Sequence, residues 1–176
     1  RVLSGIIGET LVGELAAQTD SLKKNPNLDG YPDLVQTSTI EMKNYFNKCK
    51  ESDFINYKFG GIEIKNTFGT KKSGSLIIKG DPRIEQINKK LDWKAHHQFT
   101  NNLLAVFSDY NNGLPRISAV CFNNNLTESD WSTVQRPKAG SAMTSFSCIT
   151  SEGYKKIRNS VKICNNDKRY LNFFNL

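Results

Sequence analysis

The amino-acid sequence predicts a fold of the α/β class, in the mixed α+β form, and three stretches support this prediction. In residues 2–18, apolar side chains recur at spacing four, which is typical of one face of a helix. In residues 60–67, apolar and charged side chains alternate, as in a strand with one buried face. Residues 103–110 and 114–122 are apolar runs separated by Asn-Asn-Gly, and Asn-Gly favours a tight hairpin turn.

The predicted N-terminal helix carries two carboxylates. Its apolar stripe consists of Leu3, Ile7, Leu11 and Leu15. On a helical wheel, Glu14 falls inside this stripe, whereas Glu9 lies almost opposite and is expected to be solvated. A carboxylate on an apolar face needs a partner. The interpretation of Glu14 stays open: it reaches a metal ion or a catalytic lysine, or it forms a structural ion pair, or it lies at the helix edge.

The segment after this helix combines a turn, a strand and a second helix. Residues 25–32 are rich in Asn, Pro, Asp and Gly and predict a turn, after which Asp33 begins a strand. Ser38 and Glu41 have the spacing of a capping box and predict a helix to about residue 50. If Glu41 caps this helix, it is not a metal ligand, although Glu41 and Lys43 form an acid-x-lysine triplet. The capping box therefore favours a later acidic residue, Glu63, as the ligand.

The strand predicted at residues 60–67 places an acid beside a lysine. Since side chains alternate between the two faces, Ile62 and Ile64 point to one side and Glu63 and Lys65 to the other. The glycine pair that precedes them allows a bend or the close approach of another strand. Asp33 would supply a second carboxylate from an adjacent strand. Two such carboxylates can hold Mg²⁺, and a lysine beside them can orient a water molecule and offset phosphate charge.

The rest of the chain is predicted from local signals. Further elements are strands at residues 76–78, 144–150 and 161–164, a helix at residues 127–134 capped by Thr127, a helix at residues 151–159 capped by Ser151, a basic loop at residues 136–141 and an aromatic tail at residues 170–174 that packs on the domain. His96 and His97 are adjacent, which is a poor spacing for zinc. Either they line a DNA cleft or lie near a scissile phosphate, or they lie on a helix surface.

Composition limits the classes of function. The 176 residues fit one domain, and no apolar run approaches the roughly 20 residues that span a membrane, so we expect a soluble protein. Lys and Arg number 24 against 17 Asp and Glu, which gives a net charge of +7. This excess favours a polyanionic partner over the alternative that the charge serves only to keep the protein in solution. The four cysteines form no CxxC pair and no signal peptide is visible, so we expect reduced thiols in a cytoplasmic protein.

Two motifs lead to a resemblance. Pro32-Asp33 and Glu63-Ile64-Lys65 resemble the two halves of the motif of the PD-(D/E)XK nuclease superfamily. The size, the glycine pair and the basic C-terminal half look most like a type II restriction endonuclease. The resemblance covers about residues 5–122, and residues 123–176 form a basic C-terminal part of what would be a single endonuclease domain, 1–176. It implies a central mixed β-sheet flanked by helices.

The resemblance also implies roles for individual residues. Asp33, Glu63 and Lys65 would be catalytic, with Asp33 and Glu63 as metal ligands and Glu14 as an accessory one. The cofactor would be Mg²⁺, for which Mn²⁺ can substitute, with no organic cofactor, and the protein would act as a homodimer on double-stranded DNA and leave 5′-phosphates. The DNA-binding candidates are Lys71, Lys72, Arg136 and Lys138, together with His96 and His97.

Three alternative functions remain open. The first is a nuclease of the same fold that repairs, nicks or resolves branched DNA, which a comparison of branched with plain duplex would distinguish. The second is a non-catalytic DNA-binding module, which would bind without regard to Mg²⁺ and release no product. The third, an RNA-binding protein, is less attractive because the sequence lacks a glycine-aromatic RNA motif.

Overall fold

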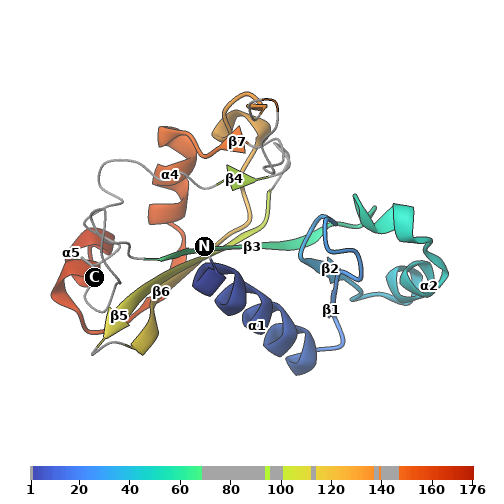
Figure 1. Ribbon diagram of the computed structural model, residues 1–176, viewed down its shortest axis with the longest axis horizontal. Helices are drawn as coiled ribbons and strands as arrows, with labels where there is room; N and C mark the ends of the chain where they lie inside the picture. Colours follow the sequence, from blue (N-terminus) through green and yellow to red (C-terminus); the bar gives the residue numbers. More distant parts are fainter. Residues whose placement is uncertain (1, 69–93, 96–100, 112–113, 137–138, 140–146) are drawn as a thin grey trace. The chain divides into compact units, whose positions relative to one another are not determined.

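The structure is a computed structural model that describes residues 2–68, 94–95, 101–111, 114–136, 139 and 147–176. The chain divides into two compact units, Arg1–Ile64 and Lys65–Leu176. The described residues form four α-helices and eight β-strands, which confirms the α+β class (Figure 1). No helix in these ranges is long and apolar enough to cross a bilayer. The single domain inferred from the length stays a prediction.

The first unit joins two helices to a small antiparallel sheet. Its elements are α1 (Val2–Gln18), β1 (Leu22–Lys24), β2 (Leu34–Gln36), α2 (Ile40–Lys48), the 3₁₀ helix η1 (Glu51–Phe54) and the first half of β3 (Gly61–Phe68). Strand β2 pairs antiparallel with both β1 and β3, and Leu34 lies opposite Ile62. The strand expected to begin around Asp33 is therefore β2.

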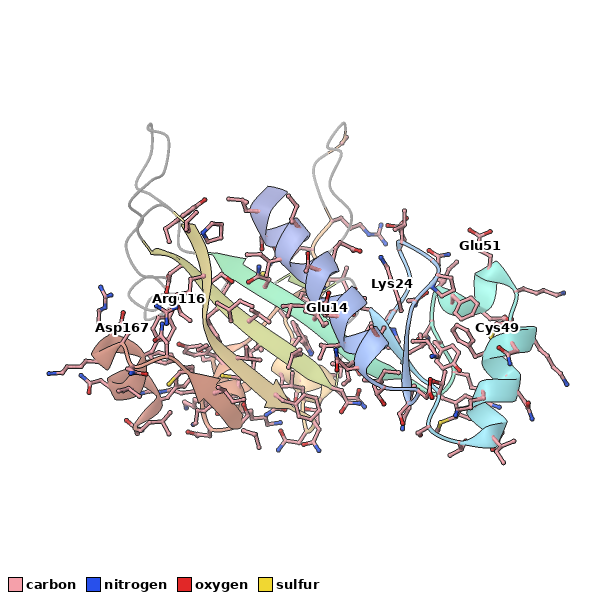
Figure 2. The ribbon with its side chains drawn as sticks, turned by 90° about the horizontal axis from the view of Figure 1, so that it is seen from below. Glu14, Lys24, Cys49, Glu51, Arg116 and Asp167 are labelled. Carbon is pink, nitrogen blue, oxygen red and sulfur yellow. The ribbon has the colours of Figure 1, made fainter. Side chains whose placement is uncertain are left out.

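The helix α1 has the predicted bounds, but only part of the predicted stripe is packed, since Ile7, Leu11 and Leu15 are partly buried and Leu3 is exposed. Its buried residue is Val12, at 5% exposure, and Glu14, labelled in Figure 2, is exposed. The placement of Glu14 on the packed face was therefore wrong. Apolar residues occur on most sides of this helix, and Ile6 is 55% exposed, so the spacing-four stripe does not determine which face packs. Glu9 is exposed and pairs with Lys24 at 2.7 Å, as expected for a solvated carboxylate.

The N-cap of α2 differs from the prediction by one residue. The hydroxyl of Thr39, not that of Ser38, accepts a hydrogen bond from the backbone N–H of Met42 at 3.2 Å. Adjacent Ser and Thr have similar capping ability, so the sequence alone does not separate them. Glu41 lies exposed in the first helical turn. The predicted capping box of Ser38 and Glu41 was therefore wrong, and capping does not exclude Glu41 as a ligand.

Aromatic side chains hold α2 against the segment that leads into β3. Phe54 and Tyr57 are buried with Val35, and their rings stack at a centroid distance of 5.9 Å. The Tyr57 hydroxyl donates a hydrogen bond to the carbonyl oxygen of Met42 at 3.3 Å. Burial raises the pKa of Tyr57 to about 12, so this hydroxyl stays protonated at neutral pH. The cluster fixes the chain just before the glycine pair.

The glycine pair before β3 allows the close approach expected from the sequence. Gly60 has φ 67° and Gly61 has φ 157°, both in the region that favours glycine. A Cβ atom at Gly61 would overlap the carbonyl oxygen of Leu34, whereas a Cβ atom at Gly60 would meet nothing within 4 Å. Only Gly61 is therefore required by both its conformation and its contact.

We expect Gly61→Ala to lower the free energy of unfolding by about 2 kcal/mol or more, because β2 must move away from β3. In the matched variant Gly60→Ala, the new Cβ atom meets no neighbouring atom. The free energy of unfolding should therefore fall by only about 1 kcal/mol, from the positive φ alone. Urea denaturation of the two variants measures the difference. Equal losses would contradict the close approach between Gly61 and Leu34.

The second unit contains the longest strands. Its elements are the rest of β3, β4 (Lys94–Ala95), β5 (Leu103–Asn111), β6 (Leu114–Asn123), the 3₁₀ helix η2 (Glu128–Asp130), β7 (Ser147–Cys148), α4 (Ser151–Arg158), β8 (Val161–Cys164) and α5 (Lys168–Phe174). The antiparallel pairing of β5 with β6 continues to Asn111 opposite Leu114, which confirms the hairpin. Hydrogen-bonded neighbours follow the order β1-β2-β3-β5-β6-β8, with β3 shared by both units, and β4 pairs with β7.

The core of the second unit lies between the β5–β6 hairpin and the helices α4 and α5. Ile157 of α4 and Phe174 of α5 are buried with Phe107 of β5 and Cys121 of β6. The hydroxyl of the fully buried Tyr170 donates a hydrogen bond to a carboxylate oxygen of Asp109 at 2.6 Å. The prediction that the aromatic tail packs on the domain is confirmed. All four cysteines are free, as expected, and burial raises the pKa of Cys121 to about 12.

Several local predictions in the second unit need correction. Thr127 caps a helix as expected, but the helix is the short η2 rather than a segment through residue 134. The N-cap of α4 is Thr150 instead of Ser151. The strand predicted at residues 144–150 is reduced to β7 among the described residues, since 140–146 lie outside them. The strand predicted at residues 76–78 also lies outside the described residues. Strand β8 matches its prediction.

Candidate functional site

Asp33 and Glu63 lie together at the pairing of β2 with β3. Asp33 immediately precedes β2, and the register of Leu34 opposite Ile62 makes Asp33 and Glu63 the next pair across the two strands. The backbone N–H of Ile64 donates a hydrogen bond to Asp33 Oδ2 at 2.7 Å. In return, the backbone N–H of Asp33 donates to Glu63 Oε2 at 3.3 Å. The two carboxylates are thus held by reciprocal bonds to the facing strand.

The local sequence explains this arrangement. Ile62 and Ile64 alternate with Glu63, so the strand places the carboxylate on the face away from the isoleucines. Glu63 is 4% exposed, and a carboxylate this deeply buried requires polar contacts such as the bond from Asp33. Lys65 follows on the same face of β3 by alternation and is half-buried. The strand therefore carries an acid and a lysine in the order that sequence reasoning predicted.

The two carboxylates fit Mg²⁺ by the chemistry of their donor atoms. Mg²⁺ prefers oxygen ligands and is commonly bound by one or two carboxylates, the other positions being filled by water and phosphate. Within the described ranges, no three His, Cys, Asp or Glu side chains gather as a metal-binding group. Glu14 is exposed, and its role as an accessory ligand stays a prediction.

Asn25 contacts the segment that carries Asp33, and sequence reasoning missed it. Its side chain is 5% exposed and donates hydrogen bonds to the carbonyl oxygens of Pro32 at 3.0 Å and Phe54 at 2.9 Å. Its backbone N–H donates to the carbonyl oxygen of Asp33 at 2.9 Å. The sequence gives little sign of this role, because an Asn in a Pro- and Gly-rich turn is usually a surface residue.

The remaining predicted DNA contacts are mostly not placed. Arg136 is exposed, as a phosphate contact would require. The other candidates, Lys71, Lys72, His96, His97 and Lys138, lie outside the described residues. Their roles stay predictions.

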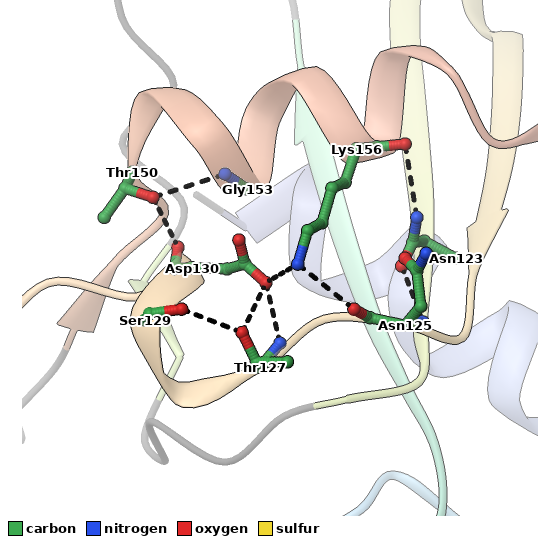
Figure 3. A network of polar contacts seen from close by, with 8 residues as sticks. All are labelled: Asn123, Asn125, Thr127, Ser129, Asp130, Thr150, Gly153 and Lys156. Carbon is green, nitrogen blue, oxygen red and sulfur yellow. Dashed lines mark hydrogen bonds and ion pairs between the residues drawn. The ribbon is translucent and has the colours of Figure 1, made fainter.

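A second buried carboxylate, Asp130, belongs to the second unit and organises the N-terminus of α4 (Figure 3). The Asp130 side chain is 2% exposed, and its Oδ2 accepts hydrogen bonds from Lys156 Nζ at 2.6 Å and from the Thr127 backbone N–H at 2.7 Å. Its carbonyl oxygen accepts from the backbone N–H and the hydroxyl of Thr150. Burial alone would raise the pKa of Asp130, but the bonds from Lys156 and Thr127 outweigh it and lower that pKa.

A pocket of ≈ 570 Å³ lies beside this cluster, between the end of β6 and α4. Its charged side chains are compensated, since Lys155 pairs with Glu152 at 2.8 Å and Lys156 pairs with Asp130. It does not include Asp33 or Glu63. The pocket therefore offers no excess positive charge for a polyanion and is not part of the candidate site.

Comparison with known proteins adds no relative. No protein-family model, curated protein or solved structure matches the chain. The candidate site therefore consists of two carboxylates from adjacent strands, followed along β3 by a lysine.

Proposed function

We propose that the chain is a Mg²⁺-dependent, sequence-specific endonuclease of double-stranded DNA, similar to type II restriction enzymes of the PD-(D/E)XK kind. The observation that supports it most is the pair of reciprocal hydrogen bonds at Asp33 and Glu63. These bonds bring two carboxylates, which can act as metal ligands, together on neighbouring strands. The net charge of +7 supports a polyanionic substrate. Action as a cytoplasmic homodimer and a restriction-endonuclease-like core are parts of this proposal.

The proposed chemistry divides between the metal ion and the chain. Bound Mg²⁺ would polarise the phosphoryl oxygen and lower the pKa of a water molecule. The carboxylates of Asp33 and Glu63 would hold the ion, and the pairing of β2 with β3 would fix their geometry before substrate arrives. The ammonium group of Lys65 orients the attacking water and offsets negative charge on the phosphate. Hydrolysis leaves a 5′-phosphate and a 3′-hydroxyl.

The test is incubation of the purified protein with phage DNA of known sequence, in Mg²⁺ and in EDTA, followed by gel electrophoresis and sequencing of the ends. Discrete fragments that require Mg²⁺ support the proposal, and Mn²⁺ should replace Mg²⁺. A smear would mean cleavage without sequence specificity. Intact plain duplex combined with cleavage of nicked, mismatched or branched DNA would instead assign the same chemistry to a structure-specific nuclease.

One observation favours a second function, that of a non-catalytic DNA-binding module. Each candidate carboxylate accepts a hydrogen bond from a backbone N–H group. Such a hydrogen bond also suits a purely structural role, in which the two carboxylates join β2 to β3. Under this alternative, EDTA would not change the affinity for DNA, as measured by gel shift, and no DNA substrate would be cut. Mg²⁺-dependent release of 5′-phosphate ends would exclude it.

A further inference from the structure

The contacts of Asn25 converge on the backbone of Asp33 from both sides. The side-chain Nδ2 of Asn25 donates a hydrogen bond to the carbonyl oxygen of Pro32. This oxygen belongs to the peptide unit before the Cα atom of Asp33. A second donor, the backbone N–H of Asn25, reaches the carbonyl oxygen of Asp33, which belongs to the peptide unit after that atom. Because the two peptide planes flanking one Cα atom determine the direction of its Cβ atom, Asn25 helps to set the direction of the Cα–Cβ bond of Asp33, from which its carboxylate extends.

The same contacts link Asn25 to Glu63. The peptide unit between Pro32 and Asp33 accepts a bond from Asn25 at its oxygen and donates a bond to Glu63 Oε2 at its nitrogen. The Asp33 carboxylate in turn accepts from the N–H of Ile64. A rotation of this peptide unit would therefore move both carboxylates at once.

The site around the Asn25 amide leaves no spare room. Its Nδ2 also donates to the carbonyl oxygen of Phe54, and its Oδ1 accepts from the N–H of Asn27 at 2.9 Å. A Cβ atom at Gly30 would lie 2.5 Å from Asn25 Nδ2 and from the Phe54 carbonyl oxygen. Gly30 thus leaves the space that the amide fills, and the amide is held in a single orientation.

We propose that Asn25 is a positioning residue that holds Asp33 and Glu63 in the geometry that binds the divalent cation, an inference that rests on the proposed function. Without the Asn25 amide, the carbonyl oxygens of Pro32 and Phe54 lose their donor and the peptide before Asp33 can rotate. The expected consequence is weaker binding of Mg²⁺ by a protein that is still folded. Residues that orient metal ligands in this way typically change metal affinity or activity by about 10- to 100-fold.

The experiment compares the full-length wild type with Asn25→Ala and with the isosteric Asn25→Leu. Isothermal titration with MgCl₂ in the absence of DNA gives the metal affinity, and DNA cleavage at increasing Mg²⁺ gives the half-saturating concentration. Both are measured at a temperature where circular dichroism shows each variant folded. Gly30→Ala, which crowds the amide without removing a hydrogen-bonding group, serves if the Asn25 variants do not fold.

The matched control is Asn123→Ala in the second unit. Asn123 is also buried, at 6% exposure, and its amide donates to the carbonyl oxygen of Lys156 and accepts from the N–H of Asn125. Its loss should lower the melting temperature and leave the affinity for Mg²⁺ unchanged. This control separates a general loss of stability from a specific effect on the carboxylates.

We expect the Asn25 variants to bind Mg²⁺ about 10- to 100-fold more weakly and to need correspondingly more Mg²⁺ for cleavage. The inference is overturned if the folded Asn25 variants bind Mg²⁺ as tightly as the wild type, or if Asn123→Ala loses as much Mg²⁺ affinity as they do. In either case, Mg²⁺-dependent cleavage by the wild type leaves the proposed function intact. If the wild type neither binds Mg²⁺ nor cleaves DNA, the proposed function fails, and the positioning role fails with it.

Discussion

Replacement of Lys65 by alanine is expected to lower the rate of DNA cleavage by about 10²- to 10⁴-fold, the range typical of a lost proton-transfer or water-orienting group. The fold and the affinity for DNA should be retained, because Lys65 is half-buried on a strand whose pairing depends on the backbone. Single-turnover cleavage with saturating protein measures the chemical step, and a gel shift in Ca²⁺ measures binding. Cleavage near the wild-type rate would show that the catalytic site lies elsewhere.

The matched control for Lys65 is the other acid-x-lysine triplet. Glu41 and Lys43 lie on α2, and Glu41 is exposed in the first turn of that helix. Because Thr39 caps α2, Glu41→Gln should change the free energy of unfolding by less than about 1 kcal/mol. It should also leave cleavage intact. A folded but inactive Glu41→Gln variant would move the site to α2 and overturn the assignment of Glu63 and Lys65.

The second large effect is expected from the pair of Asp130 and Lys156. Lys156→Met should lower the free energy of unfolding by about 2–3 kcal/mol, because it leaves the buried carboxylate without its cation. This expected loss of unfolding free energy is smaller than that for a fully buried ion pair, because 35% of the Lys156 side chain is exposed to solvent. The double variant Asp130→Asn/Lys156→Met should recover part of this loss, since no buried charge remains. Urea denaturation at pH 7 checks both, and a fully stable Lys156→Met would contradict the prediction.

The same pair predicts a dependence of stability on pH. The pKa of Asp130 is lower in the folded state than its ordinary value of about 3.9, so its contribution to stability is present above that value. The contribution is lost as the pH falls toward the lower pKa of the folded state. Asp130→Asn should therefore lose less stability than the wild type between pH 6 and about pH 3, as measured by thermal melts. An equal loss in both proteins would contradict the lowered pKa.

Strong patterns in the sequence predicted several elements well. The bounds of α1 follow from its apolar spacing, and the β5–β6 hairpin follows from two apolar runs around Asn-Gly. The proximity of Asp33 to Glu63 could be anticipated because one residue precedes a strand and the other lies within one. These features depend on residues that are close in sequence or on a single antiparallel pairing.

Other features depend on choices that the sequence leaves open. Thr39 and Thr150 each lie beside a serine of similar capping ability, so both predicted caps were displaced by one residue. Glu14 was misplaced because α1 is apolar on most sides. Asn25 was missed because its role depends on Phe54, 29 positions away, and local patterns do not report such a contact.

The bond from the Ile64 amide to the Asp33 carboxylate makes one backbone proton a spectroscopic reporter of the candidate site. Any event that draws electron density from this carboxylate weakens the bond, whether it is protonation or capture of a cation. The ¹H and ¹⁵N resonances of Ile64 should therefore respond to both events, and the amide of Asp33 should respond to the same events at Glu63. The two amides together thus report on the pair of carboxylates in solution without substrate.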